Sequence, residues 1–419
     1  MKRYKIGIFG AGIRGLDLVR NFQLLGSEIT AICEFRPERR RIAAETLGES
    51  VTVYDDFDAF LNHDMDAVIL ANYFHEHAPY AIKCLEKGLH VYSECISNGT
   101  MAEGVELVRA FQKSSAIYML AENYPQMIFN REIKRICDTK TLGKILYAEG
   151  EYNHPGDAND TRFKKDYTYF EHHWRNYLPR TYYCTHSLGP IMYATGATPK
   201  RVTAFATFAP ILEEAPVASF VGDRSAIMMT ENDDGSVFRF TGCAAFGAHH
   251  NSYRVCGTNG QIENVRGMGN KIMLRYNSWN VPEGYEKEKL YDPEWNDPDE
   301  EMIVSSGHGG SDYLTARIFL RCIEEGRQPE HPYNIYAATA MSSVAILAHR
   351  SMMNGGQPMD IPDFREEACL KAYENDRLSP FYGTDGSTPD IPCCSNPDFR
   401  PTEEQLKKYN ELIVQKSNE

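Results

Sequence analysis

The chain has 419 residues, of which 42% are hydrophobic and 24% are charged, ordinary values for a soluble globular protein with room for two domains. Its formal charge of −14 argues against a nucleic acid or an anionic membrane as partner, because both need a basic protein face. The 11 cysteines include no Cys-x-x-Cys pair, which favours reduced thiols in the cytoplasm over a disulfide scaffold. No apolar run reaches the ~18 residues that span a bilayer, and the N-terminus does not read as a signal peptide.

A glycine-rich turn follows the first expected strand, residues 4–9. The turn Gly10-Ala11-Gly12-Ile13-Arg14-Gly15 has a strand before it and helical periodicity after it, the context that a G-x-G-x-x-G dinucleotide motif requires. Gly10 permits the tight turn, and Gly12 lets the backbone approach a pyrophosphate. The pattern therefore predicts a dinucleotide site that Gly10, Gly12, Ile13 and Arg14 contact.

An acidic residue ends the second expected strand, residues 28–33. Glu34 stands about 20 residues after the last glycine of the motif, where a carboxylate usually hydrogen-bonds the ribose hydroxyls. Because a carboxylate repels a 2′-phosphate, Glu34 favours NAD over NADP. Arg36, Arg39 and Arg40 weaken this preference, and Arg39 is itself a candidate cofactor contact.

Further strands are expected at 65–71, 88–92 and 118–121, with helices between them. This alternation predicts an α/β fold whose N-terminal domain, residues 1–122, is a Rossmann-type, doubly wound parallel sheet with ligands at the carboxyl ends of its strands. The segments that follow these strands supply the other candidate cofactor contacts: Asn72, His75, His77, Glu94 and Asn123.

Past residue 122 the strands follow one another directly, with hairpin signals at 232–235 and 258–260. Residues 123–370 are therefore predicted to form an α+β domain with an open, mainly antiparallel sheet that carries the substrate. Residues 268–303 are acidic, show little apolar periodicity and are expected to form loops or an insertion. A helix at 313–325 is expected to return to the first domain, and 371–419 to form an extended tail with a short terminal helix.

Tyr183 and His186 are the most informative residues in the second half. Histidine is the natural proton-transferring residue near neutral pH, so this pair predicts that chemistry takes place where the second domain faces the cofactor. A structural role for either side chain stays open: His186 as a hydrogen-bonded core residue and Tyr183 as a packing residue.

Several of these segments resemble the Gfo/Idh/MocA oxidoreductases over roughly residues 1–365: the glycine motif, Glu34, His77-Ala78-Pro79 and His90-Val91-Tyr92-Ser93-Glu94. That family pairs a Rossmann domain with an open-sheet domain and mostly oxidises or reduces sugars and cyclitols with NAD(P). The chain departs from it at two positions. Cys95 stands where the dehydrogenases usually have a lysine, and Tyr182 stands where they have an aspartate.

A branch without the lysine is glycoside hydrolase family 109, the NAD-dependent glycosidases. Its Tyr-x-Thr-His-x-Leu-Gly-Pro and Gly-His-Gly-Gly-x-Asp segments are similar to 183–190 and 307–312, and its lead-in segment is similar to 173–176. The resemblance implies a redox-neutral cycle. Carbon 3 of the sugar is oxidised, a base removes the proton on carbon 2, the aglycone leaves carbon 1, water adds, and the same cofactor reduces the ketone.

The resemblance also implies roles for the residues of the second half. His186 would relay the carbon 3 hydroxyl proton, and Tyr183 would act at carbon 2 with a phenol pKa lowered by cationic surroundings, or the two roles are exchanged. The candidates for substrate binding are Tyr152, His154, Arg175, Tyr177, His308 and Asp312. Each has an ordinary alternative: packing for the aromatic residues, a helix cap for Asp312 and solvent exposure for His308. The adjacent His172 and His173 do not predict a metal site, since no carboxylate pair completes one.

Three hypotheses follow from the sequence: a redox-neutral glycosidase, a net NAD-dependent dehydrogenase of sugars or cyclitols, and a catalytically silent binding or sensor protein. All three retain NAD and a small carbohydrate. By analogy with the family, the chain is expected to form a homo-oligomer, either a dimer or a tetramer, through the exposed face of the open sheet.

Overall fold

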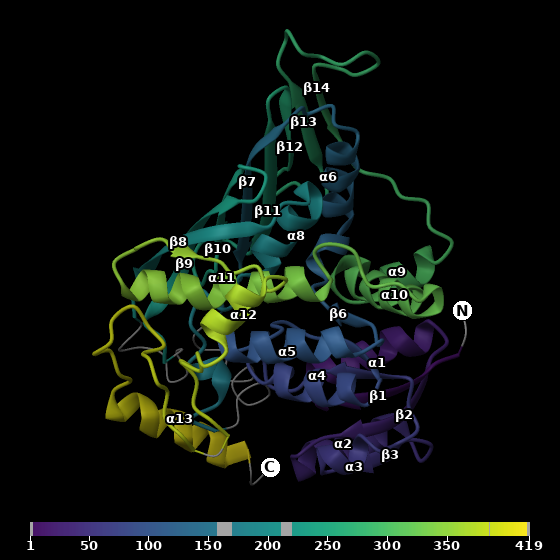
Figure 1. The fold of residues 1–419 in the computed structure, drawn as a ribbon, viewed down its shortest axis with the longest axis vertical. Helices are drawn as coiled ribbons and strands as arrows, with labels where there is room; N and C mark the ends of the chain where they lie inside the picture. The colour runs from purple at the N-terminus through teal and green to yellow at the C-terminus, as the bar shows by residue number, and fades with distance from the viewer. Residues whose placement is uncertain (1–2, 157–169, 211–219, 385, 417–419) are drawn as a thin grey trace.

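The computed structural model describes residues 3–156, 170–210, 220–384 and 386–416. The described chain contains two sheets. In Figure 1 the N-terminal sheet and its helices occupy the lower right, and the second sheet rises above them to a narrow tip. The helix at 403–416 lies at the lower left.

The first sheet is parallel, with the strand order β3-β2-β1-β4-β5-β6. Its two central strands, residues 5–9 and 67–70, are apolar and buried apart from Lys5, as a sheet covered by helices on both faces requires. The strands are β1 (Lys5–Phe9), β2 (Glu28–Cys33), β3 (Thr52–Tyr54), β4 (Ala67–Leu70), β5 (His90–Ser93) and β6 (Tyr118–Leu120). The helices are α1 (Ile13–Leu24), α2 (Pro37–Leu47), α3 (Phe57–Phe60), α4 (His77–Glu86) and α5 (Met101–Lys113). This order confirms the predicted doubly wound fold and places its switch point between β1 and β4.

The second sheet has the order β14-β13-β12-β11-β7-β10-β9-β8-β15, and all its pairs are antiparallel except β7 with β10. The predicted open, mainly antiparallel sheet is therefore confirmed. Its strands are β7 (Ile145–Asn153), β8 (Pro199–Phe208), β9 (Asp223–Asn232), β10 (Val237–Thr241), β11 (His250–Gly257), β12 (Gly260–Asn264), β13 (Ile272–Tyr276), β14 (Glu288–Tyr291) and β15 (Met359–Asp360). One of its faces exposes apolar side chains such as Phe205 and Met229; the oligomer expected there stays a prediction.

Helical segments of the second half cover the other face of this sheet or join it to the first. They are η1 (Tyr124–Gln126), α6 (Ile128–Asp138), η2 (Trp174–Asn176), α8 (Thr185–Thr195), α9 (Glu300–Ser305), η3 (His308–Gly310), α10 (Ser311–Glu325) and α11 (Ile335–Met353). The tail contributes α12 (Glu367–Tyr373) and α13 (Glu403–Lys416). None of the helices in the described parts of the chain is long and apolar enough to cross a membrane.

The expectation of loops at 268–303 is wrong, because β13, β14 and α9 all lie in this range. In β13 the buried side chains of Ile272, Leu274 and Tyr276 alternate with more exposed ones, a two-residue period that suits a half-buried strand. Only five residues carry this pattern, and the acidic segments around it concealed the signal.

Helix α10 returns to the N-terminal domain, as expected, and packs against α1. The ring of Phe319 lies 6.2 Å from Phe22 and 5.3 Å from Tyr92, so the two halves share one apolar cluster. The boundaries at residues 122 and 370 stay predictions. The shared cluster nevertheless means that the start of α10 is held directly beside the glycine turn.

Candidate active site

The glycine turn has the geometry of a phosphate cradle. Gly10 has a φ of +101°, which only glycine adopts readily, and a Cβ on Gly15 would lie 2.0 Å from the carbonyl oxygen of Gly10. A Cβ on Gly12 would meet nothing within 4 Å. Gly12 precedes α1 without any capping side chain, so backbone N–H groups at the start of α1 face open space. An anionic pyrophosphate fits there.

Glu34 lies beside this turn, as predicted for the ribose-binding acid. Its carboxylate accepts hydrogen bonds from the backbone N–H groups of Ala11 and Arg36, both at 2.9 Å. The Nε of Arg39 donates to the carbonyl oxygen of Ala11 at 3.0 Å. Both side chains therefore fix the glycine turn, and the carboxylate stands at the end of β2 where an adenosine ribose fits.

Arg14 and Asp312 join the glycine turn to α10. The guanidinium of Arg14 donates two hydrogen bonds to Asp312, at 2.8 and 2.9 Å, and its Nε donates to Glu94 at 2.7 Å. Asp312 also accepts from Asn123 at 2.7 Å and from the ring of His308 at 2.8 Å. Burial would raise the pKa of the Asp312 carboxyl, but the charge of Arg14 and the bond from His308 hold it well below its usual value.

This network corrects the prediction for Asp312. Its side chain is only 2% exposed and its oxygens are taken by protein donors, so the structure does not support it as a ligand for sugar hydroxyls. Helix α10 begins at Ser311 with Gly310 before it, so Asp312 is not the cap either. We call Arg14, Asp312, Glu94, Asn123 and His308 the latch.

The three candidates after β4 differ in their surroundings. Asn72 donates to the carbonyl oxygen of Glu76, while its own Oδ1 is buried without a hydrogen-bond partner and is available to a ligand. The ring of His75 stacks on Phe381 of the tail at 4.3 Å, and burial lowers its pKa to about 3. His77 is buried and bonds the carbonyl oxygen of Ile96 at 2.8 Å, which favours a supporting role for it over the expected cofactor contact.

His186 forms a buried pair with Glu122, which follows β6. The Nδ1–H of His186, in the first turn of α8, donates to the two carboxylate oxygens of Glu122 at 2.8 and 3.0 Å. Glu122 is fully buried and also accepts from the Sγ of Cys95 at 3.2 Å. Burial alone would raise the pKa of Glu122, yet the positive charge of His186 keeps it below its usual value. A carboxylate on Nδ1 leaves Nε2 as the nitrogen that exchanges protons.

Aromatic rings enclose the imidazole of His186. Tyr124 stacks on it at 4.0 Å and Tyr152 meets it edge-on at 5.0 Å. The hydroxyl of Tyr183 lies 3.4 Å from Nε2. The predicted pair of Tyr183 and His186 is thus brought together, at the end of the parallel sheet that faces the second domain.

The expected lowering of the Tyr183 pKa is wrong. Burial raises the pKa of this phenol well above its usual value, and the nearby charge of Arg175 offsets only part of that rise. Tyr183 is therefore a neutral hydrogen-bonding group at physiological pH, and it is not suited to act as an anionic base.

The other substrate candidates divide into two groups. The ring of His154 lies 5.6 Å from that of Tyr152, and His154 also bonds His249 at 3.1 Å. The ring of His308 lies 5.9 Å from that of Tyr124. His154 and His308 therefore border the site. Arg175 lies over the ring of Trp174 and acts electrostatically on Tyr183.

Tyr177 does not join this group, which corrects its assignment. Its ring packs with Phe220 at 5.5 Å and with Tyr382 of the tail at 4.7 Å. Buried in a separate apolar cluster, it serves the docking of the tail. No three histidine, cysteine or acidic side chains in the described ranges come together as a metal site.

The sequence places Glu122 and Tyr124, on either side of Asn123, at the cofactor edge, but it predicts no role for them. Their signal was available: both follow directly after the last parallel strand, where ligands of such sheets bind. The contact to His186 spans 64 residues of sequence, and no local pattern encodes it.

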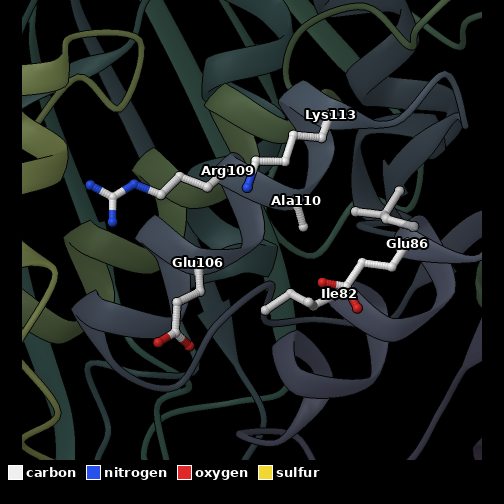
Figure 2. A pocket seen from close by; sticks show the side chains of 7 residues that line it. Ile82, Glu86, Glu106, Arg109, Ala110 and Lys113 are labelled. Atoms are coloured by element: carbon white, nitrogen blue, oxygen red, sulfur yellow. The ribbon is translucent and has the colours of Figure 1, made fainter.

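A cavity of about 450 Å³ lies elsewhere, between α4 and α5 (Figure 2). Its charged lining includes Glu86, Glu106, Arg109 and Lys113. Arg109 also pairs with Glu374 at 2.8 Å beside α12. No residue of the pair, the latch or the aromatic enclosure lines this cavity, so it is not part of the candidate active site.

Comparison with known proteins gives two family matches. Residues 4–122 match the oxidoreductase family with an NAD-binding Rossmann fold, which confirms the predicted cofactor domain, and residues 213–371 match the C-terminal domain of glycosyl hydrolase 109. Glycosyl hydrolase family 109 proteins of Stenotrophomonas maltophilia and a Shewanella species are 23% and 26% identical. These alignments cover 87% of this chain in both cases, and 89% and 85% of those proteins.

Solved structures share the fold. A levoglucosan dehydrogenase in complex with NADH and L-sorbose superposes with a TM-score of 0.68 at 18% identity, covering 87% of this chain and all of that one. A myo-inositol 2-dehydrogenase from Lactobacillus plantarum gives 0.65 at 18% identity, with 86% and 100% covered. At this level of identity the likeness concerns architecture alone.

Proposed function

Because the chain belongs to the Gfo/Idh/MocA oxidoreductases and carries a C-terminal domain of the glycosyl hydrolase 109 type, we propose that it cleaves a glycosidic bond with NAD and without net oxidation. The observation that carries this proposal is the Glu122–His186 pair with Cys95 against it. Cys95 occupies the position of the usual dehydrogenase lysine. Burial, followed by the charges of Glu122 and Glu94, raises the pKa of its thiol well above the usual value, so the thiol does not replace the lysine in proton transfer.

Bound NAD would supply a hydride acceptor, and later a hydride donor, for carbon 3 of the sugar. The groups suited to hold it are the open start of α1 at Gly12, the carboxylate of Glu34 and the unpartnered Oδ1 of Asn72. All of them lie at the carboxyl ends of parallel strands, where this fold binds ligands.

The proton of the carbon 3 hydroxyl is assigned to His186. Glu122 holds Nδ1 protonated, so Nε2 accepts the proton, and the carboxylate stabilises the imidazolium that forms. Tyr183, neutral and 3.4 Å from Nε2, is placed to pass this proton or to orient the hydroxyl. The rings of Tyr124 and Tyr152 restrict the access of water to the imidazole.

The test is incubation of the purified protein with a panel of nitrophenyl glycosides while nitrophenol release and NADH absorbance are followed together. Release of nitrophenol with no build-up of NADH supports the proposal. NADH that accumulates in step with sugar oxidation would instead identify a net dehydrogenase, the second candidate, whose fold is shared by the levoglucosan and myo-inositol enzymes.

A further inference from the structure

Arg180 and Arg224 belong to segments that contact the backbone beside the catalytic cluster. Arg180 donates from Nε to the backbone carbonyl oxygen of Asp223 at 2.9 Å, and Arg224 is the next residue of β9. Within the residues that the structure describes, neither guanidinium forms an ion pair. Both are half-buried. Burial, followed by the like charge of Arg180, lowers the pKa of Arg224, so the two cations are neighbours without a compensating anion.

The backbone of 242–245 holds these arginines and the catalytic residues in one wall. A Cβ on Gly242 would lie 2.0 Å from the carbonyl oxygen of Arg180, and the N–H of Ala245 donates to the carbonyl oxygen of Arg224 at 2.7 Å. Between them, the N–H of Cys243 donates to the carbonyl oxygen of Tyr183 at 2.8 Å. The backbone of 242–245 therefore contacts Arg180, Tyr183 and Arg224 in turn. We call this backbone segment and the residues that it contacts the wall.

The same short segment also reaches the histidines at the end of β7. The N–H of Ala244 donates to the carbonyl oxygen of Tyr152 at 2.9 Å, and its own carbonyl oxygen accepts from the N–H of His154. His154 in turn bonds His249. Cys243 packs with Tyr124 and Tyr152, and its thiol is close enough to Arg180 for that charge to act on it. The charge of Arg180 therefore acts on a residue that packs against the aromatic rings around His186.

A cationic wall is unexpected in a chain with a formal charge of −14. Carboxylates pair with most other partly buried arginines, for example Arg14, Arg317 and Arg350. Two half-buried guanidinium groups that lie close together repel each other, and an anion that binds both removes this repulsion. The planar guanidinium matches carboxylate, sulfate and phosphate groups with two parallel hydrogen bonds.

We propose that Arg180 and Arg224 form a subsite for an anionic group on the substrate, so that the enzyme acts on glycosides that carry a carboxylate, a sulfate or a phosphate. This inference rests on the proposed function for the site and adds the class of substrate. The sugar ring faces His186 and Tyr183, and its anionic substituent faces the arginines across the 242–245 segment.

Paired nitrophenyl glycosides that differ only in charge test the proposal: a glucuronide with a glucoside, a galacturonide with a galactoside, and sulfated or phosphorylated sugars with their parent sugars. We expect kcat/KM to be at least about tenfold higher for one anionic member than for its neutral partner, the effect of a charge-assisted hydrogen bond. The pair with the largest ratio identifies the anion.

The variants Arg180→Gln and Arg224→Gln should each lower this ratio about tenfold. The control is Arg201→Gln, an exposed arginine of β8 that pairs with Asp360 and Glu231 on the sheet surface and should leave the ratio unchanged. A native enzyme that prefers the neutral glycosides, or a ratio that neither subsite variant alters, overturns the proposal.

Failure of the subsite and failure of the glycosidase proposal are separable. The ratio can be measured from NADH formation as well as from nitrophenol release. An anionic preference seen only in NADH formation supports the subsite while it contradicts redox-neutral cleavage. Nitrophenol release without any preference for anionic glycosides, and without NADH formation, supports redox-neutral cleavage and contradicts the subsite. Calorimetric binding of glucuronate against glucose to the NAD-loaded protein, with and without Arg224→Gln, gives a readout that needs no turnover.

Discussion

Two imidazole–carboxylate pairs adjoin the ring of Tyr124, and they differ in what else the carboxylate binds. Glu122 gives both of its oxygens to His186, whose side chain is 12% exposed. Asp312 bonds His308 at the same 2.8 Å, but it also receives two bonds from Arg14, and His308 is 43% exposed. In the first pair the structure records no arginine or lysine bonded to the carboxylate among the described residues. In the second the negative charge is already balanced by a guanidinium.

This difference suits the Glu122–His186 pair to proton transfer and the Asp312–His308 pair to holding segments of the chain together. A carboxylate that bonds Nδ1 orients the imidazole and stabilises the imidazolium that forms when Nε2 accepts a proton. A carboxylate neutralised by arginine loses most of that influence, but it joins segments that are 298 residues apart in sequence. We therefore propose that the Glu122 pair acts in catalysis and that the latch aligns the two halves.

Glu122→Gln tests the assignment most severely. The amide cannot compensate the imidazolium, and we expect kcat to fall by about 10³-fold, within the range for a lost general base and its orienting acid. Nitrophenol release by the folded variant measures it, with a thermal melt as the folding control. A loss of less than tenfold would contradict the assignment, as would an equal loss of kcat in Asp312→Asn.

Asp312→Asn should instead affect stability. Removal of one partner from a buried ion pair lowers the free energy of unfolding by about 3 kcal/mol at neutral pH. The pKa of Asp312 is depressed in the folded state, so its contribution is complete above the unfolded carboxyl pKa of about 4 and is lost as the pH falls below it toward the folded value. Urea unfolding at several pH values should show the difference between native protein and variant shrinking in acid. A difference that is independent of pH would count against the latch.

In the glycine turn, Gly12→Ala should lower the affinity for NAD and leave the stability of the fold unchanged. The open space at this position accommodates a methyl group without any protein clash, whereas the same change at Gly15 collides with the carbonyl of Gly10. We expect Gly12→Ala to weaken NAD binding about tenfold, or about 1.4 kcal/mol, with an unchanged unfolding midpoint. Gly15→Ala is the matched contrast and should lower the midpoint. Unaltered NAD affinity in the first variant would place the cofactor elsewhere.

The smallest effect is expected for Tyr183→Phe. The hydrogen bond to Nε2 is long, so its loss should lower kcat by only about fivefold. Because burial raises the pKa of this phenol, the alkaline side of the pH–rate profile should be the same in the native enzyme and the variant. If the alkaline decline in rate disappears in the variant, the Tyr183 phenol titrates within the pH range of activity, which would contradict its raised pKa.

The N-terminal half could be predicted closely because its signals are local. The strand at 28–33 and the glycine turn depend on short patterns of residue type, and the structure has both. Helix α11 was not predicted, since it is buried on nearly all sides and shows no amphipathic period.

The site could be predicted only in part, for a different reason. The motif around Tyr183 and His186 predicted two residues whose side chains the structure places 3.4 Å apart, but the carboxylate partner of His186 lies far away in sequence. The sign of the Tyr183 pKa shift and the true partners of Asp312 depend on burial and on contacts between the two halves. Neither burial nor such contacts can be read from the type of residue alone.

The most direct test of the central claim is the reaction in deuterated water, followed by NADH absorbance, nitrophenol release and magnetic resonance of the sugar. Proton transfer at His186 within a redox-neutral cycle predicts nitrophenol release, no net NADH and deuterium on carbon 2 of the released sugar. Glu122→Gln should abolish the nitrophenol release and the deuterium incorporation. Released sugar that carries no deuterium, or cleavage that continues undiminished without Glu122, would contradict it.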